Sequence, residues 1–161
     1  MTVDGITYVH SGTEDTALYN DPKNLLALVE KAIGVSPTVS KVADRPGYVF
    51  GNSRYVWNGM DILANETTAS ILVTSPAVNG IPLKTKQGIA VGSSRADVLA
   101  NQGKNPYNDN KEDSLALDFQ EQPGTSSLSH PGSVGMDYIL LPMEKDAVER
   151  ILSPSNDYAD L

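Results

Sequence analysis

The stretches "NGMDIL" (58–63) and "VGMDYIL" (134–140) decide how the rest of the chain is interpreted. Each places Gly-Met-Asp before residues that favour β-strands. Similar landmarks surround both: Asp-Gly-Ile or Asn-Gly-Ile upstream, then Gly-x-x-Pro, and Ile-Leu with Ser-Pro at the close. Matches in the same order predict an internal duplication, with one unit at 1–78 and another at 79–161. The alternative is two unrelated segments that share common turn residues.

Two helices are predicted from their end signals. The first has Asp21 as N-cap, Pro22 at its first position and Gly34 after its last turn, with apolar residues at helical spacing between them. The second begins with a capping-box pattern at Ser94 and Asp97 and closes at Gly103.

Strands are predicted after each helix, because these segments are rich in β-branched and aromatic residues and are separated by short turns. They are 48–50, 54–57, 60–64, 69–75, 114–119, 136–141 and 148–153. Short connections favour antiparallel pairing. One helix and a few strands cannot bury their apolar faces alone, so the two units should pack together or share one sheet. The predicted fold class is α+β: two tandem helix-plus-antiparallel-strand repeats in one compact unit, with the helices on one sheet face.

Composition excludes several classes of function. The chain has 161 residues, a formal net charge of −8 and no cysteine. Its basic residues are scattered, so nucleic-acid binding is excluded, whereas a basic patch on a partner protein is compatible. Without cysteine there is no disulfide, thiolate metal site or thiol nucleophile. The opening "MTVDGITYVHSG" lacks the features of a signal peptide, which fits either a cytosolic protein or a secreted one without its leader.

Candidate catalytic and metal-binding groups are few. Asp61 and Asp137 are related by the repeat, and a paired-carboxylate hydrolase is one alternative function. The acidic stretch 108–113 offers oxygen ligands for calcium from Asp109, Glu112 and Asp113, which makes a calcium or small-ligand carrier another alternative, although the turn glycine of an EF-hand is absent. Neither is preferred, so we expect no catalytic residues, metal ligands or cofactor.

An aromatic cluster is the strongest candidate for a binding surface. Tyr48, Phe50, Tyr55 and Trp57 fall within ten residues, and Arg54 lies beside them. Period-two alternation puts Tyr55 and Trp57 on one strand face. Two interpretations stay open: core packing against a helix, or an exposed patch on the helix-free sheet face, where tyrosine and tryptophan often anchor partners. The predicted binding residues, which include one from the second Gly-Met-Asp strand, are Tyr48, Phe50, Arg54, Tyr55, Trp57 and Tyr138.

The segment "GIAVGSSRADVLANQG" (88–103) resembles a stretch of small bacterial envelope lipoproteins. That group includes the small outer-membrane-assembly lipoproteins and the β-lactamase-inhibitor-protein-like fold, whose tandem form presents a concave, aromatic-rich sheet to its target. The stretches "RYVWNGMDIL" (54–63) and "VNGIPLKTKQGIAVGSSRADVL" (78–99) also look like secreted lipoproteins of Gram-positive bacteria.

The resemblance implies a non-enzymatic protein outside the cytoplasm, secreted or held at the cell envelope by a lipid anchor. We therefore expect an inhibitor-like or other binding domain that recognises a protein or an envelope component through its aromatic sheet face. Contact with the membrane is expected only through the anchor.

Overall fold

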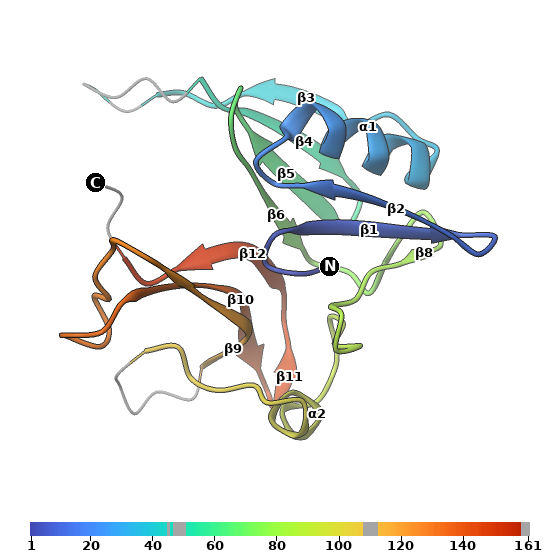
Figure 1. Cartoon of the computed structure of the whole chain (residues 1–161). Helices are drawn as coiled ribbons and strands as arrows, with labels where there is room; N and C mark the ends of the chain where they lie inside the picture. The colour runs from blue at the N-terminus through green and yellow to red at the C-terminus, as the bar shows by residue number, and fades with distance from the viewer. Residues whose placement is uncertain (45, 47–50, 108–112, 159–161) are drawn as a thin grey trace.

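The computed structural model describes residues 1–44, 46, 51–107 and 113–158. Its main element is an antiparallel sheet of eight strands in the order β11-β10-β12-β6-β5-β4-β3, with β9 on the outer side of β10. In Figure 1 this sheet curves from β3 to β9, while α1 and the β1–β2 hairpin lie on one side of it. The strands of the sheet are β3 (Thr38–Lys41), β4 (Ser53–Trp57), β5 (Met60–Ala64), β6 (Ala69–Val73), β9 (Ser114–Gln122), β10 (Gly135–Glu144), β11 (Ala147–Val148) and β12 (Ile151–Asn156).

Two small sheets accompany the large one. The hairpin β1 (Gly5–His10) and β2 (Thr13–Leu18) turns through Ser11 and Gly12, both at positive φ (49° and 79°), which matches the twist of antiparallel strands. The short strands β7 (Ala77–Val78) and β8 (Ile81–Pro82) form the other pair.

The two helices follow their predicted start signals. In α1 (Pro22–Ile33) the Asp21 side chain accepts a hydrogen bond from the Asn24 amide, and Gly34 ends the helix at φ 72°. In α2 (Arg95–Ala100) the capping box of Ser94 and Asp97 is present. This helix ends at Ala100, three residues before the predicted closing residue Gly103. The Gly103 amide donates a hydrogen bond to the Val98 carbonyl.

The predicted α+β class of two helix-plus-strand repeats is wrong. The described residues form a β-rich fold in which one eight-stranded antiparallel sheet dominates. The physical reason is that α2 has only six residues and buries only Val98, so it is too small to cover a set of strands. The buried sheet face is instead covered largely by α1 and the β1–β2 hairpin, a hairpin that the strand prediction omitted. The boundaries 1–78 and 79–161 stay a prediction.

The core lies between the sheet and these covering elements. Alternate residues of the central strands, such as Ile62, Ile71 and Ile151, are fully buried, and they pack with Leu25 and Val29 of α1. Their sheet neighbours one position along point to the opposite face, which therefore carries a separate set of side chains. Among the described residues, no helix is long and apolar enough to cross a membrane.

Candidate binding surface

The predicted aromatic anchors of β4 lie on the covered side of the sheet. Trp57 is 5% exposed, and its indole Nε1 donates a hydrogen bond to the Val35 carbonyl at 2.7 Å. Tyr55 is half-buried and packs against the core, opposite the fully buried Ile62. Of the two interpretations, the structure therefore supports core packing for Trp57 and Tyr55, and neither belongs to a patch on the helix-free face. Tyr48 and Phe50 lie outside the described residues.

Arg54 points to the other face of β4, where it pairs with Asp61 of β5. Its Nε lies 2.8 Å from Asp61 Oδ2, and its Nη2 contacts the same oxygen. The guanidinium side chain remains about half exposed, whereas the Asp61 side chain is mostly covered. Arg54 is thus available at the surface of the helix-free face, with its charge shared with a neighbouring carboxylate.

The Asp61 and Asp137 carboxylates are not brought together. Strands β5 and β10 are separated by β6 and β12, so three strand spacings, about 14 Å along the sheet, lie between them. Period-two alternation along the paired strands also puts the two side chains on opposite faces. Asp137 has its own partners, Gln122 Nε2 at 2.6 Å and the Tyr158 hydroxyl at 2.7 Å. Hydrolysis by paired carboxylates needs the two carboxyl groups to lie less than about 10 Å apart, so this geometry does not support it.

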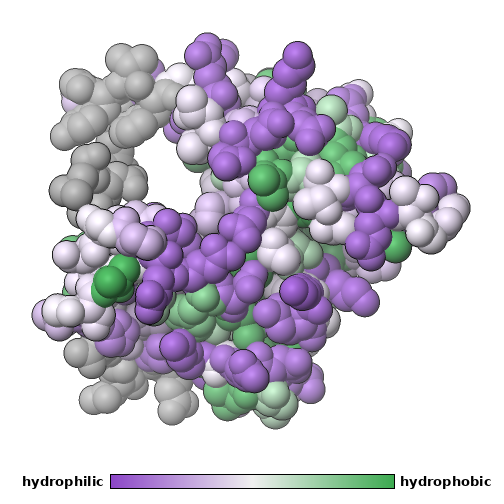
Figure 2. Space-filling model, in the orientation of Figure 1, coloured by the Kyte–Doolittle hydropathy of each residue, from purple (hydrophilic) through white to green (hydrophobic). Residues whose placement is uncertain are grey.

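A cross-strand row of residues runs over the helix-free face. It passes through residues that face one another in register: Val56, Asp61, Leu72, Leu152, Leu140 and Ala116. The three leucines are adjacent and half-buried, and Leu63, one row away, is 37% exposed. No helix or hairpin among the described residues lies over this part of the sheet, and Figure 2 shows the surface hollowed between the β3–β4 end and the β9–β10 end. The result is an aliphatic surface at the centre of a concave face.

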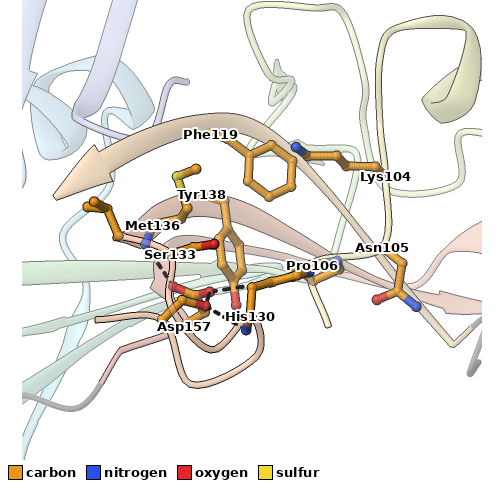
Figure 3. A pocket seen from close by; sticks show the side chains of 11 residues that line it. Lys104, Asn105, Pro106, Phe119, His130, Ser133, Met136, Tyr138 and Asp157 are labelled. Atoms are coloured by element: carbon orange, nitrogen blue, oxygen red, sulfur yellow. Dashed lines mark hydrogen bonds and ion pairs between the residues drawn. The ribbon is translucent and has the colours of Figure 1, made fainter. Parts of the chain in front are cut away.

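A small cavity of about 210 Å³ lies at the β9–β10 end of this face. Figure 3 shows its aromatic wall, formed by Phe119 and Tyr138, with Met136 next along β10. The two ring centroids are 5.5 Å apart, and the Lys104 Nζ lies 4.3 Å from the centroid of the Phe119 ring. The ring attracts the Lys104 ammonium, whose remaining N–H donors can bond to an anionic group of a partner.

Tyr138 is a structural part of that wall. It is 1% exposed, and its hydroxyl donates a hydrogen bond to the Asn156 carbonyl at 3.0 Å. Burial, together with Tyr107 and the nearby carboxylates, raises the pKa of the Tyr138 phenol above its usual value. Tyr138 therefore packs against Phe119 in the wall of the cavity rather than standing exposed on the face, and its part in binding stays a prediction.

The cavity also holds a serine, a histidine and an aspartate, but not in a catalytic order. The Ser127 hydroxyl donates directly to Asp157 Oδ2 and accepts a hydrogen bond from the His130 backbone amide at 2.8 Å. His130 Nδ1 is 3.9 Å from the same carboxylate oxygen. In a Ser-His-Asp triad the histidine stands between the other two groups. Here Asp157 stands between the other groups, and its Oδ1 also accepts a hydrogen bond from the Met136 amide of β10. The carboxylate therefore links the loop that contains Ser127 and His130 to the end of the sheet.

The candidate calcium loop, 108–113, lies largely outside the described residues, since only Asp113 is described. Among the residues that the structure does describe, no group of three or more histidine, cysteine, aspartate or glutamate side chains is arranged to hold a metal ion.

Comparisons with known proteins add no further assignment. No family model matches the chain, and no curated protein or solved structure matches it significantly. The site is therefore defined by its own geometry.

The leucines of the helix-free face were missed at the sequence level for an identifiable reason. In "ASILVTS" (69–75) and "ERILSP" (149–154) apolar residues follow one another without alternation, so period two does not separate the buried face from the exposed one. A usable signal was nevertheless present. Strands with two apolar faces need a covering element on each side, and the predicted second helix is too short to cover one of them.

Proposed function

We propose that this protein is a non-catalytic binding domain that recognises another protein through the helix-free face of its large sheet. The observation that carries the proposal is the set of adjacent, half-exposed leucines, Leu72, Leu152 and Leu140, in register at the centre of a concave face. Solvent-facing positions in the middle of a sheet are ordinarily polar, so a contiguous aliphatic surface there favours an interaction site.

The chemistry of the partner follows from charge and shape. The chain carries a formal net charge of −8, which favours a partner that is basic overall, while Arg54 and Lys104 at the two ends of the face favour acidic groups opposite those positions. The small cavity beside Tyr138 is of a size to take one side chain of that partner, as the central pockets of protein interfaces do. The recognition surface is therefore aliphatic in the middle and aromatic at one end, rather than the aromatic surface expected from β4.

The proposed location is outside the cytoplasm, in a secreted or lipid-anchored form. This part of the proposal is supported by the resemblance of 88–103 to envelope lipoproteins.

The test is a comparison of charge substitutions on two surfaces. Leu72→Lys and Leu152→Lys place a cation in the proposed site, where a basic partner would be repelled. Leu99→Lys is the matched control, because Leu99 is also exposed but lies on α2, away from the face. All three variants are first compared with wild type by circular dichroism and thermal melting.

The readout is chemical crosslinking to envelope and secreted proteins, with the crosslinked positions mapped by mass spectrometry. We expect crosslinks that border β6, β10 and β12, lost in Leu72→Lys and Leu152→Lys and retained in Leu99→Lys. Identical crosslinks for folded Leu72→Lys and wild type would exclude this face as the binding surface.

A further inference from the structure

A second and larger cavity, of about 720 Å³, lies on the covered side of the molecule. One wall is formed by Ile6–Val9 of β1, and the opposite wall by the segment 81–86. Its floor is apolar and is built from Leu28, Val29 and Ile33 of α1 together with Met60. The volume is within the range of about 300–1,000 Å³ that ligand sites occupy. This groove is separate from the helix-free face that carries the proposed function.

The edge of β1 that borders the groove is unpaired. The Tyr19 amide donates to the Asp4 carbonyl, and bonding positions alternate along an antiparallel pair, so Asp4, Ile6 and Tyr8 bond across the hairpin. Gly5, Thr7 and Val9 then direct their backbone groups away from β2. The Gly5 carbonyl accepts a hydrogen bond from the Thr2 amide at 2.9 Å, which confirms that it points away from β2. No described residue forms a backbone hydrogen bond with the outward groups of Thr7 and Val9.

One end of the groove is already filled in the manner of a strand. The Met1 nitrogen donates to the Lys84 carbonyl at 2.9 Å, and the Met1 carbonyl accepts from the Lys86 amide at 2.8 Å. Met1 thus donates to Lys84 and accepts from Lys86, two positions later. This is the hydrogen-bonding pattern of two parallel strands. Because the chain reverses between Met1 and Gly5, Met1 lies antiparallel to β1. Backbone therefore fits between the two walls at this end.

The charges along the groove are unequal. Lys84 and Lys86 are exposed and lie at the Met1 end, whereas Glu14, the acidic residue of the lining, lies beside Val9 at the other end. An occupant should therefore carry its negative charge near Met1. The apolar floor requires that alternate side chains of the occupant be aliphatic, because successive side chains of a strand point to opposite faces.

We propose that this groove binds an extended peptide segment of a partner protein, which adds as a strand to the free edge of β1. The peptide runs antiparallel to β1, bonds to the outward backbone groups of Thr7 and Val9, and places aliphatic side chains over Leu28 and Ile33. Acidic residues at its C-terminal end lie near Lys84 and Lys86. In such strand addition, backbone hydrogen bonds supply affinity and the side-chain pockets supply specificity.

The probe is a synthetic eight-residue peptide, acetyl-Val-Thr-Val-Thr-Val-Glu-Val-Glu-amide, and its counterpart has lysine in place of both glutamates. Binding to the ¹⁵N-labelled full chain is followed by NMR. We expect the Thr7 and Val9 amide signals to shift and their hydrogen exchange to slow with the acidic peptide. The lysine peptide should bind at least about tenfold more weakly.

Thr7→Pro tests the edge directly, since it removes an outward N–H and leaves the hairpin bonds of Ile6 and Tyr8 in place. Thr16→Pro is the matched control: Thr16 faces Thr7 across the hairpin, and both substitutions remove the same hydroxyl contact of 2.9 Å. We expect Thr7→Pro to weaken peptide binding by about tenfold or more and Thr16→Pro to leave it unchanged.

Three outcomes overturn the proposal: no shift of the Thr7 and Val9 signals at millimolar peptide, equal affinity for both peptides, or equal affinity of wild type and folded Thr7→Pro. Binding of a free fatty acid such as myristate in the groove, unaffected by Thr7→Pro and competing with no peptide, would identify the groove as a site for single-chain lipids instead.

Discussion

Leu72 and Leu152 lie directly opposite each other in the antiparallel pair of β6 and β12. This pair joins strands from distant parts of the chain at the centre of the large sheet. On the same two strands, one position along, the fully buried Ile151 faces Val73 on the other side of the sheet. Ile151 and Leu152 are neighbours on β12 but point to opposite faces of the sheet. Substitutions at Ile151 therefore test the stability of the core, whereas substitutions at Leu152 test the proposed binding surface.

Ile151→Ala and Leu152→Ala should differ clearly in stability. Ile151 is completely buried, and its truncation leaves a cavity that costs about 2–5 kcal/mol. Leu152 keeps part of its surface in water, so its truncation should cost about 1 kcal/mol. Urea unfolding at constant m-value measures both free energies of unfolding. Equal losses would show that the helix-free face is packed as tightly as the core.

Trp57→Phe should be destabilising by about 2–3 kcal/mol. It removes apolar volume from the core and leaves the Val35 carbonyl without its indole donor. The chain has one tryptophan, so its fluorescence in the native protein should be blue-shifted and weakly quenched by acrylamide. Val39→Ala, at a position 55% exposed on the neighbouring strand, is the control and should change stability by less than about 0.5 kcal/mol. Strong acrylamide quenching of Trp57 would show that its indole is exposed to solvent, against this prediction.

Much of the secondary structure could be predicted from local signals. Asp21, Pro22 and Gly34 define α1 because each acts on its own backbone, and "MDILA" (60–64) coincides with β5. The β1–β2 hairpin was predictable as well, since Ile6 and Tyr8 alternate with polar residues before a Ser-Gly turn. Without this hairpin, the two helices are the only predicted elements that could cover the sheet, so the predicted architecture places both of them on one face.

The candidate site was less predictable because it depends on pairing over long distances. Nothing local indicates that Leu72 and Leu152 become neighbours, or that the segment 104–106 lines one cavity with Tyr138. Which face of β4 is buried is likewise a tertiary property: Tyr55 and Val56 are both apolar enough for either side. The surface position of Arg54 was recognisable from its charge alone.

Asp157→Asn should lower stability by about 2–3 kcal/mol. The carboxylate is 3% exposed and accepts hydrogen bonds from the Met136 amide and the Ser127 hydroxyl. The substitution removes the charge that strengthens both bonds, and with the remaining oxygen kept for the Met136 amide, the Ser127 hydroxyl loses its acceptor. Asp146→Asn is the control, because the Arg95–Asp146 ion pair involves a carboxylate that is 82% exposed and should contribute at most about 1 kcal/mol. Thermal melting compares the two. Similar melting temperatures would mean that the 127–134 loop adds little to the fold.

Tyr19→Phe should leave the protein as stable or make it more stable, by up to about 1 kcal/mol. The Tyr19 hydroxyl is buried, and no described side chain or backbone group forms a hydrogen bond of normal geometry with it, so its removal relieves a desolvation cost. A loss of more than about 1 kcal/mol would reveal a partner for this hydroxyl.

The same residue should make stability depend on alkaline pH. Burial is the main cause that raises the pKa of the Tyr19 phenol above its value in an unfolded chain, with the Ser153 hydroxyl acting in the opposite direction. Below about pH 10 both states are protonated, and the preference for the neutral phenol in the folded state is fully present. Above that pH the unfolded state loses its proton first, so the free energy of unfolding should fall by about 1.4 kcal/mol per pH unit from this residue. Urea unfolding between pH 8 and about pH 11.5 should therefore show a steeper decline for wild type than for Tyr19→Phe. Parallel curves would mean that water reaches the Tyr19 hydroxyl in the folded protein, because a hydrated phenol would ionise at the same pH in both states.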